Sequence, residues 1–128
     1  MNREIKFRIW ANTNDGLKMI YLDTFKFDNG LWFQSDEHVD EYEETIMQFT
    51  GLKDKNGKEI YEGDILVKDE HKWKVIWDNK RAAFALWRIS PDKRYFDGRI
   101  QAPMAMQEYL ICETEVIGNI YENPELLK

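Results

Sequence analysis

The sequence predicts a mainly β protein with short helical segments. Three observations support this: short runs alternate apolar and polar residues, turn-forming residues separate the runs about every eight to twelve positions, and 14% of the residues are aromatic. Aromatic side chains bury large areas, so a chain of 128 residues can build a sizeable core. The pattern is typical of a small barrel or sandwich.

The N-terminal part is predicted to consist of β-hairpins. The strands expected here are residues 3–10, 17–22, 25–27 and 31–34. In the first of them, Ile5, Phe7 and Ile9 alternate with charged residues, which is the period of a half-buried strand. The last two strands are expected to join at Asn29 and Gly30, a pair suited to a tight two-residue turn.

A break in composition follows at residues 36–44. Six of these nine residues are acidic, and none is Lys or Arg. We therefore expect a loop or linker here. The predicted domains are residues 1–45, a β-hairpin unit with an acidic linker, and residues 46–128, a second β domain that ends in a short helical turn.

The second domain is predicted to contain most of the strands. They are expected at residues 46–49, 64–68, 72–78, 82–89 and 115–121. Residues 103–111 are ambiguous, but they suit a short helix, with Pro103 acceptable in its first turn. Asn123 and Pro124 predict a final helical turn, with Asn123 as its N-cap.

Three glycines, Gly51, Gly57 and Gly63, are spaced six residues apart. This spacing matches neither a phosphate-binding loop nor the dinucleotide fingerprint, so turn formation is the better interpretation. Gly57 with Asn56 predicts a type I′ hairpin turn. Gly63 permits a sharp bend, where Asp64 is expected to accept hydrogen bonds from backbone N–H groups.

Residues 49–65, which contain these glycines, resemble the hallmark segment of the YopX-like proteins of phages and prophages. The opening at residues 5–10 and the ending at residues 116–127 are also similar to that family. The resemblance implies a β-rich fold whose C-terminal part is an SH3-like barrel, in phages or prophages of Gram-positive bacteria. It implies no activity, because the function of the family is not established, and no site residue can be transferred.

Few residues suit catalysis or metal binding. Cys112 is the single cysteine, so no intramolecular disulfide or multi-cysteine zinc site can form, and its apolar neighbours predict a buried thiol. His38 and His71 lie near acidic residues, but solvated loops explain them better than a metal site. We therefore predict no enzymatic activity, no metal and no cofactor.

Charge and hydropathy limit the partners and the location. The net charge of −6 argues against indiscriminate DNA binding. No apolar run suits a signal peptide or a membrane span, so the expected location is cytoplasmic, without membrane contact. The resemblance implies that this is the cytoplasm of a bacterial host cell.

Residues 72–99 form a locally basic stretch with interleaved aromatic residues, the one feature typical of nucleic-acid binding. The candidate surface residues are Lys72, Lys74, Lys80, Arg81, Arg88, Arg94 and Tyr95. A solvated strand face is the simpler interpretation of these charges. For Trp73, Trp77 and Trp87, core packing is the simpler interpretation, and an aromatic recognition groove is the alternative.

The resemblance implies a phage or prophage origin, and with it the sequence predicts an accessory protein that binds a protein partner or forms a homo-oligomer. The alternative is a nucleic-acid-binding module that uses residues 72–99. The acidic run at residues 36–44 is most simply a solubilising loop. It also suits a mimic of phosphates, or a surface that pairs with the basic stretch of another copy.

Overall fold

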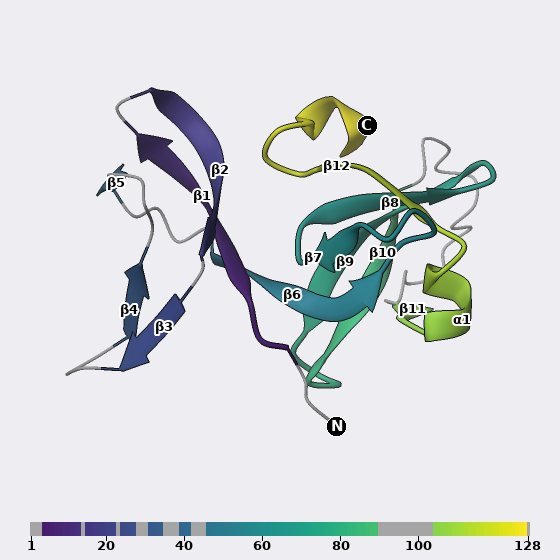
Figure 1. Ribbon diagram of the computed structural model, residues 1–128. Coiled ribbons are helices and arrows are strands. Elements are labelled where there is room, and N and C mark those ends of the chain that lie inside the picture. The colour runs from purple at the N-terminus through teal and green to yellow at the C-terminus, as the bar shows by residue number, and fades with distance from the viewer. Residues whose placement is uncertain are drawn as a thin grey trace. The chain divides into compact units, whose positions relative to one another are not determined.

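The protein is mainly β in a computed structural model, which confirms the predicted fold class (Figure 1). The structure describes residues 4–13, 15–22, 24–27, 31–34, 39–41, 46–89 and 104–127. The chain forms two compact units, Met1–Phe49 and Thr50–Lys128. The predicted domains, residues 1–45 and 46–128, stay a prediction, because compactness does not demonstrate independent folding.

The N-terminal unit is built around one long hairpin. Its strands are β1 (Phe7–Thr13), β2 (Gly16–Leu22), β3 (Thr24–Phe27), β4 (Leu31–Gln34) and β5 (Val39–Glu41), and β6 (Ile46–Lys53) begins in it. β1 pairs with β2 along its whole length and with the start of β6 on its other edge. Ile9, Ala11 and Ile20 form a buried cluster against which Phe7 packs, as the alternation of the first strand predicts.

The second hairpin of this unit is also confirmed. β3 and β4 pair antiparallel from Thr24↔Gln34 to Phe27↔Leu31. The turn expected at Asn29 and Gly30 lies outside the described residues.

The acidic run contains a strand that the sequence did not predict. β5, at the centre of residues 36–44, pairs with the end of β1. The prediction of a loop is therefore wrong for Val39–Glu41, and the rest of the run lies outside the described residues. Pairing with a strand about thirty positions earlier leaves no local signal, because strand formation depends on its neighbours more than on intrinsic propensity.

The C-terminal unit is a curled, half-barrel sheet with a hairpin and two short helices (Figure 1). Its elements are the end of β6, β7 (Glu59–Tyr61), β8 (Asp64–Lys68), β9 (His71–Asp78), β10 (Ala83–Ile89), β11 (Met104–Ala105), α1 (Glu108–Ile111), β12 (Glu115–Asn119) and the 3-10 helix η2 (Pro124–Leu127). The strand order is β11-β10-β9-β8-β12, with antiparallel neighbours throughout.

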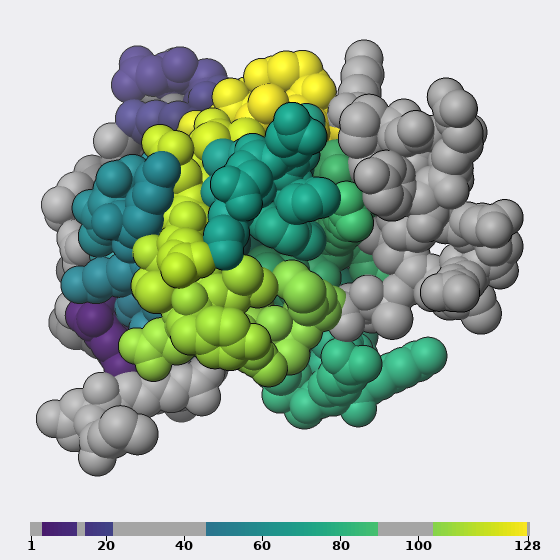
Figure 2. Space-filling model, turned by 90° about the vertical axis from the view of Figure 1, so that its right-hand side faces the viewer, coloured from purple at the N-terminus to yellow at the C-terminus, as the bar shows by residue number. Residues whose placement is uncertain are grey.

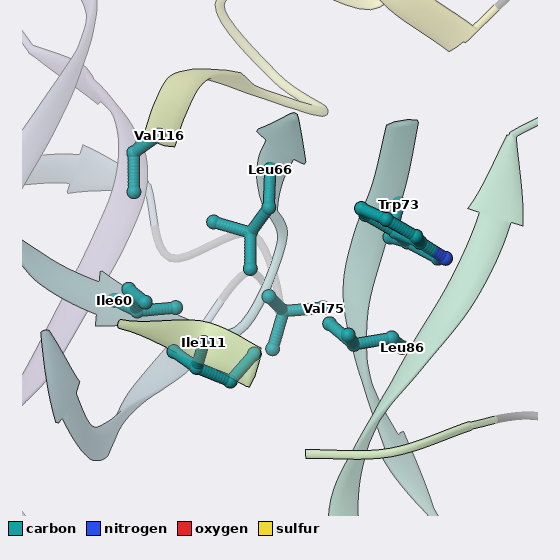
Figure 3. Packing of buried hydrophobic residues seen from close by; sticks show 7 residues of the cluster. All are labelled: Ile60, Leu66, Trp73, Val75, Leu86, Ile111 and Val116. Atoms are coloured by element: carbon teal, nitrogen blue, oxygen red, sulfur yellow. The ribbon is translucent and has the colours of Figure 1, made fainter. Parts of the chain in front are cut away.

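One hydrophobic core lies inside the curled sheet (Figure 3). Its buried side chains are Ile60, Leu66, Trp73, Val75, Leu86, Ile111 and Val116. They come from four neighbouring strands of the sheet, from β7 and from α1, so the core is enclosed between the sheet and these two elements. Each fully buried aliphatic side chain contributes about 1.5–3 kcal/mol to folding through removal of apolar surface from water.

The predicted helix at residues 103–111 is only partly present. Residues Met104–Ala105 form β11, which pairs with Leu86 and Ala85 of β10, and the helix is the single turn Glu108–Ile111. The ladder with β10 provides backbone hydrogen bonds to residues that local propensity assigns to a helix.

Cys112 corrects a second prediction, because its thiol is exposed rather than buried. The residue is the C-cap of α1, and its Sγ lies 3.3 Å from the carbonyl oxygen of Tyr109. Each helical residue turns the side chain by about 100°, so the position after the buried Ile111 faces away from the core.

Candidate interaction site

The hallmark segment, residues 49–65, contains a turn that Asp54 organises, directly after the end of β6. The N–H of Gly57 donates to the carbonyl of Asp54 over 3.0 Å, and Gly57 has a φ of 80°. Asn56 does not share a positive φ, so the predicted type I′ turn, which needs it at both central residues, is wrong. The observed turn spans four residues and ends on a left-handed glycine.

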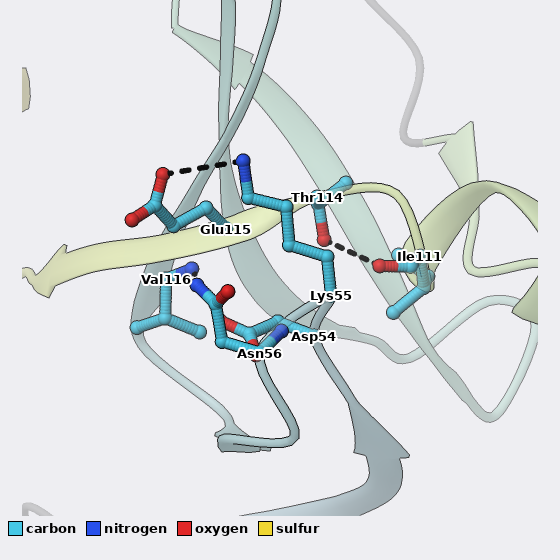
Figure 4. A network of polar contacts seen from close by, with 7 residues as sticks. All are labelled: Asp54, Lys55, Asn56, Ile111, Thr114, Glu115 and Val116. Carbon is cyan, nitrogen blue, oxygen red and sulfur yellow. Dashed lines mark hydrogen bonds and ion pairs between the residues drawn. The ribbon is translucent and has the colours of Figure 1, made fainter.

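The Asp54 carboxylate also joins this turn to β12 (Figure 4). Its Oδ1 accepts from the N–H groups of Asn56 and Lys58, both over 2.9 Å, and its Oδ2 accepts from the N–H of Val116 over 3.0 Å. Burial alone acts to raise the pKa of Asp54. The three backbone donors and the nearby Lys58 charge outweigh burial, so the pKa of this carboxyl lies below its ordinary value.

The bend at Gly63 has the structure that the sequence predicts. Gly63 has a φ of 88°, and the Oδ2 of Asp64 accepts from the N–H of Tyr61 over 2.8 Å. Gly63 also donates to the carbonyl of Val75 and accepts from the N–H of Ile120, each over 2.9 Å. The hallmark segment is therefore architectural, because its polar groups hold backbone.

The C-terminal motif is held in the same way. The Oδ1 of Asn119 accepts from Tyr121 and Glu122, over 3.0 and 2.8 Å. The final helical turn is confirmed as η2, and Asn123 occupies its N-cap position, because its carbonyl accepts from the N–H of Leu126 over 3.0 Å. Its side-chain Oδ1, however, accepts from the N–H of Asn119 over 3.3 Å. A Cβ on Gly118 would lie 2.5 Å from that oxygen, so the motif needs glycine there.

The candidate basic residues fall in three separate places. Lys72 and Lys74 lie on one face of β9, opposite Ile89 and Trp87 of β10, and Arg88 lies on the other face, opposite Trp73. Lys80 and Arg81 lie in the turn between the two strands. Arg94 and Tyr95 lie outside the described residues.

Two of these residues contact groups of the C-terminal unit itself. The Nζ of Lys72 donates to the carbonyl of Leu126 in η2 over 3.2 Å. The Nη2 of Arg88 lies 2.7 Å from the Nδ1 of His71, whose ring is 5.9 Å from that of Trp73. Both side chains therefore help to hold the fold.

The turn between β9 and β10 gathers basic and aromatic side chains, and it projects at the lower edge of Figure 2. We call Trp77, Lys80, Arg81 and Phe84 the hairpin-tip site. Trp77 and Phe84 pair directly across the strands, with ring centroids 5.1 Å apart in an edge-on arrangement. Trp77 is 41% exposed, which is unusual for a large apolar side chain beside a well-formed core.

Asp78 gives this site a fixed shape. Its Oδ1 accepts from the N–H of Lys80 over 3.0 Å, and its Oδ2 lies 3.7 Å from the Nε of Arg81. Within the described part of the chain, no acidic side chain forms an ion pair with Lys80. The turn residues 78–81 carry one negative and two positive side chains, a formal charge of +1, in the same hairpin as the exposed indole of Trp77.

The sequence did not distinguish the three tryptophans of this region. Trp73 is 9% exposed and belongs to the core, as the simpler interpretation predicts. Trp87 is half-buried on the opposite face of the sheet, and Trp77 is exposed. The signal for Trp77 was its position at the end of the strand, next to Asp78 and the turn, beyond the last core residue Val75.

No metal centre or membrane helix is found in the described part of the chain. No group of three or more His, Cys, Asp or Glu side chains there is placed to hold a metal ion. No helix among the same residues is long and apolar enough to cross a membrane.

The fold and the hallmark segment together define a class of small β-rich proteins built on a curled sheet. A family model described as YopX protein matches residues 6–128, and the chain belongs to this family. The resemblance seen in the sequence is thereby confirmed.

A solved structure and a search of curated proteins complete the comparison. The chain is similar to protein EF1440 from Enterococcus faecalis, known from a crystal structure, with 27% identity and a TM-score of 0.61. The match covers 99% of this chain and 100% of that one. No curated protein matches the sequence.

Proposed function

We propose that this chain is a non-enzymatic phage or prophage accessory protein that binds another protein through the hairpin-tip site, in the cytoplasm of the host cell. The observation that carries the proposal is the exposed Trp77, which contacts Phe84 in the same hairpin whose turn carries the cations Lys80 and Arg81. Trp and Arg are the residue types most enriched among those that dominate binding energy at protein interfaces.

The structure of the hairpin also favours binding. The edge-on contact with Phe84 restricts the Trp77 ring, and the register of β9 and β10 holds seven residue pairs from Asp78↔Ala83 to Lys72↔Ile89. A side chain that is already ordered loses little conformational entropy when a partner covers it. The tip is therefore preorganised for a partner that carries apolar and acidic groups.

Affinity capture from phage-infected cells tests this proposal, with two tip variants. Trp77→Ala and the double variant Lys80→Glu/Arg81→Glu should each lose the partner that the natural protein retains. Tyr109→Ala is the matched control, because Tyr109 is 74% exposed but lies on α1, which is not part of the hairpin. Unchanged capture by both tip variants would refute the proposal.

Nucleic-acid binding is the second candidate, because an exposed indole beside two cations also suits stacking of an unpaired base. Residues 72–99 supply fewer phosphate contacts than their composition suggests, since Lys72 and Arg88 contact groups of the protein. Titration of single- and double-stranded DNA at low salt separates the candidates. Binding that weakens steeply with salt and is lost in Trp77→Ala would favour nucleic acid. If neither DNA binds at low salt, nucleic-acid binding is excluded as the second candidate function.

A further inference from the structure

We infer that the hairpin-tip site binds the acidic run, residues 36–44, of a second copy of this chain, so that the protein associates with itself. The inference rests on the proposed function, because it names the partner of the same site. Every copy of the chain carries both surfaces: the acidic run belongs to the N-terminal unit, and the hairpin-tip site belongs to the C-terminal unit.

The charge of the chain supports this partner. The run contains six of the 24 acidic residues, so the other 18 balance the 18 Lys and Arg residues. The whole net charge of −6 therefore corresponds to the run, and the remainder of the protein is neutral. An acidic segment of this kind is attracted to the positive tip and is steered toward it by long-range electrostatics.

The chemistry of the run also matches the apolar part of the tip. Val39 and Tyr42 interrupt the acidic residues, and no Lys or Arg is present to be repelled by Lys80 and Arg81. Aromatic and aliphatic side chains supply the contacts that an exposed indole requires, and the flanking carboxylates supply those that ammonium and guanidinium groups require.

The contact pairs two different surfaces, so it is not a self-complementary patch. Two copies can exchange runs reciprocally, or several copies can associate head to tail and close into a ring. In each case a tip variant and a run variant remove the same contact from opposite sides. This reciprocity makes a charge-exchange experiment decisive.

Sedimentation velocity of the full chain over a range of concentrations and at low salt tests the inference. The tip variant is Lys80→Glu/Arg81→Glu and the run variant is Glu43→Lys/Glu44→Lys. Each alone should weaken self-association by about tenfold or more, since like charges then face each other. An equimolar mixture of the two variants should regain association, because each supplies the charges that the other lacks.

The control is Lys53→Glu/Lys55→Glu, which reverses two exposed lysines outside the tip and should leave association unchanged. Circular dichroism and thermal unfolding confirm that each variant is folded. A natural protein that stays monomeric at every concentration, or a mixture that associates no better than each variant alone, overturns the inference. If self-association is absent but the tip variants still lose a different protein in the affinity capture, the proposed function stands while the inference fails.

Discussion

The Asp54 carboxylate shows how one side chain joins two distant parts of the hallmark family pattern. It accepts three backbone N–H groups, two from its own turn and one from Val116, which is 62 residues away in sequence. The hydrogen bonds within the turn follow from local sequence, as does the bond from Tyr61 to Asp64. The bond to Val116 does not, because it depends on how β12 packs against the turn.

Asp54→Asn should lower the free energy of unfolding by about 2–4 kcal/mol. The carboxamide keeps one acceptor oxygen and directs an NH₂ group at a backbone donor, so at least one buried N–H loses its partner. Urea unfolding at neutral pH measures the change. Asp69→Asn, the same substitution in the exposed turn after β8, is the control and should stay within about 0.5 kcal/mol of the natural protein.

The same carboxylate predicts a dependence on pH. Because folding lowers the pKa of Asp54, its stabilising effect is complete above the ordinary value of 3.8 and is lost as pH falls through the lowered pKa. The stability gap between the natural protein and Asp54→Asn should therefore be constant near neutral pH and shrink below about pH 4. A gap of the same size at pH 3 and pH 7 would contradict this cause.

Gly118→Ala should destabilise the protein by about 1–3 kcal/mol, because the added methyl group meets the carboxamide of Asn123 at 2.5 Å. A double-mutant cycle with Asn123→Ala isolates the clash. In the Asn123→Ala background, Gly118→Ala should cost less than about half as much. Equal costs in both backgrounds would show that the clash is not the reason.

At the scale of elements, alternation along the strands predicted the two faces of the C-terminal sheet. Trp73 and Val75 of β9 and Leu86 of β10 lie in the core, as their period-two spacing indicates. The two wrong predictions, a loop at Val39–Glu41 and a helix that includes Met104–Ala105, share one cause. β5 and β11 form by pairing with β1 and β10, and neither partner is visible in the local sequence.

Leu86 provides the test of this core. It is fully buried, so Leu86→Ala should lower the free energy of unfolding by about 2–5 kcal/mol through lost burial and the cavity that remains. Leu127→Ala is the matched control, because Leu127 is 38% exposed in η2 and should cost much less. Chemical denaturation followed by circular dichroism measures both. Similar costs at the two positions would contradict the described core.

At the scale of the whole molecule, the sequence supplied the ingredients of the candidate site but not its location. The predicted set of basic residues is divided between two sheet faces and a turn, and Lys72 and Arg88 contact groups of the protein. Lys80 and Arg81 lie in the turn of the hairpin that also carries the exposed Trp77, and their predicted role stays a prediction. Only the length of the strands, beyond the last core residue, shows that this tryptophan reaches the surface.

The charge balance adds a second property of the whole chain. A neutral body with an acidic run and a basic, aromatic tip is suited to contact between copies, and this contact should weaken as salt screens its charges.

NMR of the indole N–H of Trp77, assigned with Trp77→Phe, tests the central claim most directly. As the protein is concentrated at low salt, the Trp77 resonance should shift and broaden, while that of the buried Trp73 stays in place. The Trp77 change should disappear in Glu43→Lys/Glu44→Lys. A Trp77 resonance that is independent of concentration, or that changes equally in the run variant, would contradict the claim that the tip binds the acidic run of another copy.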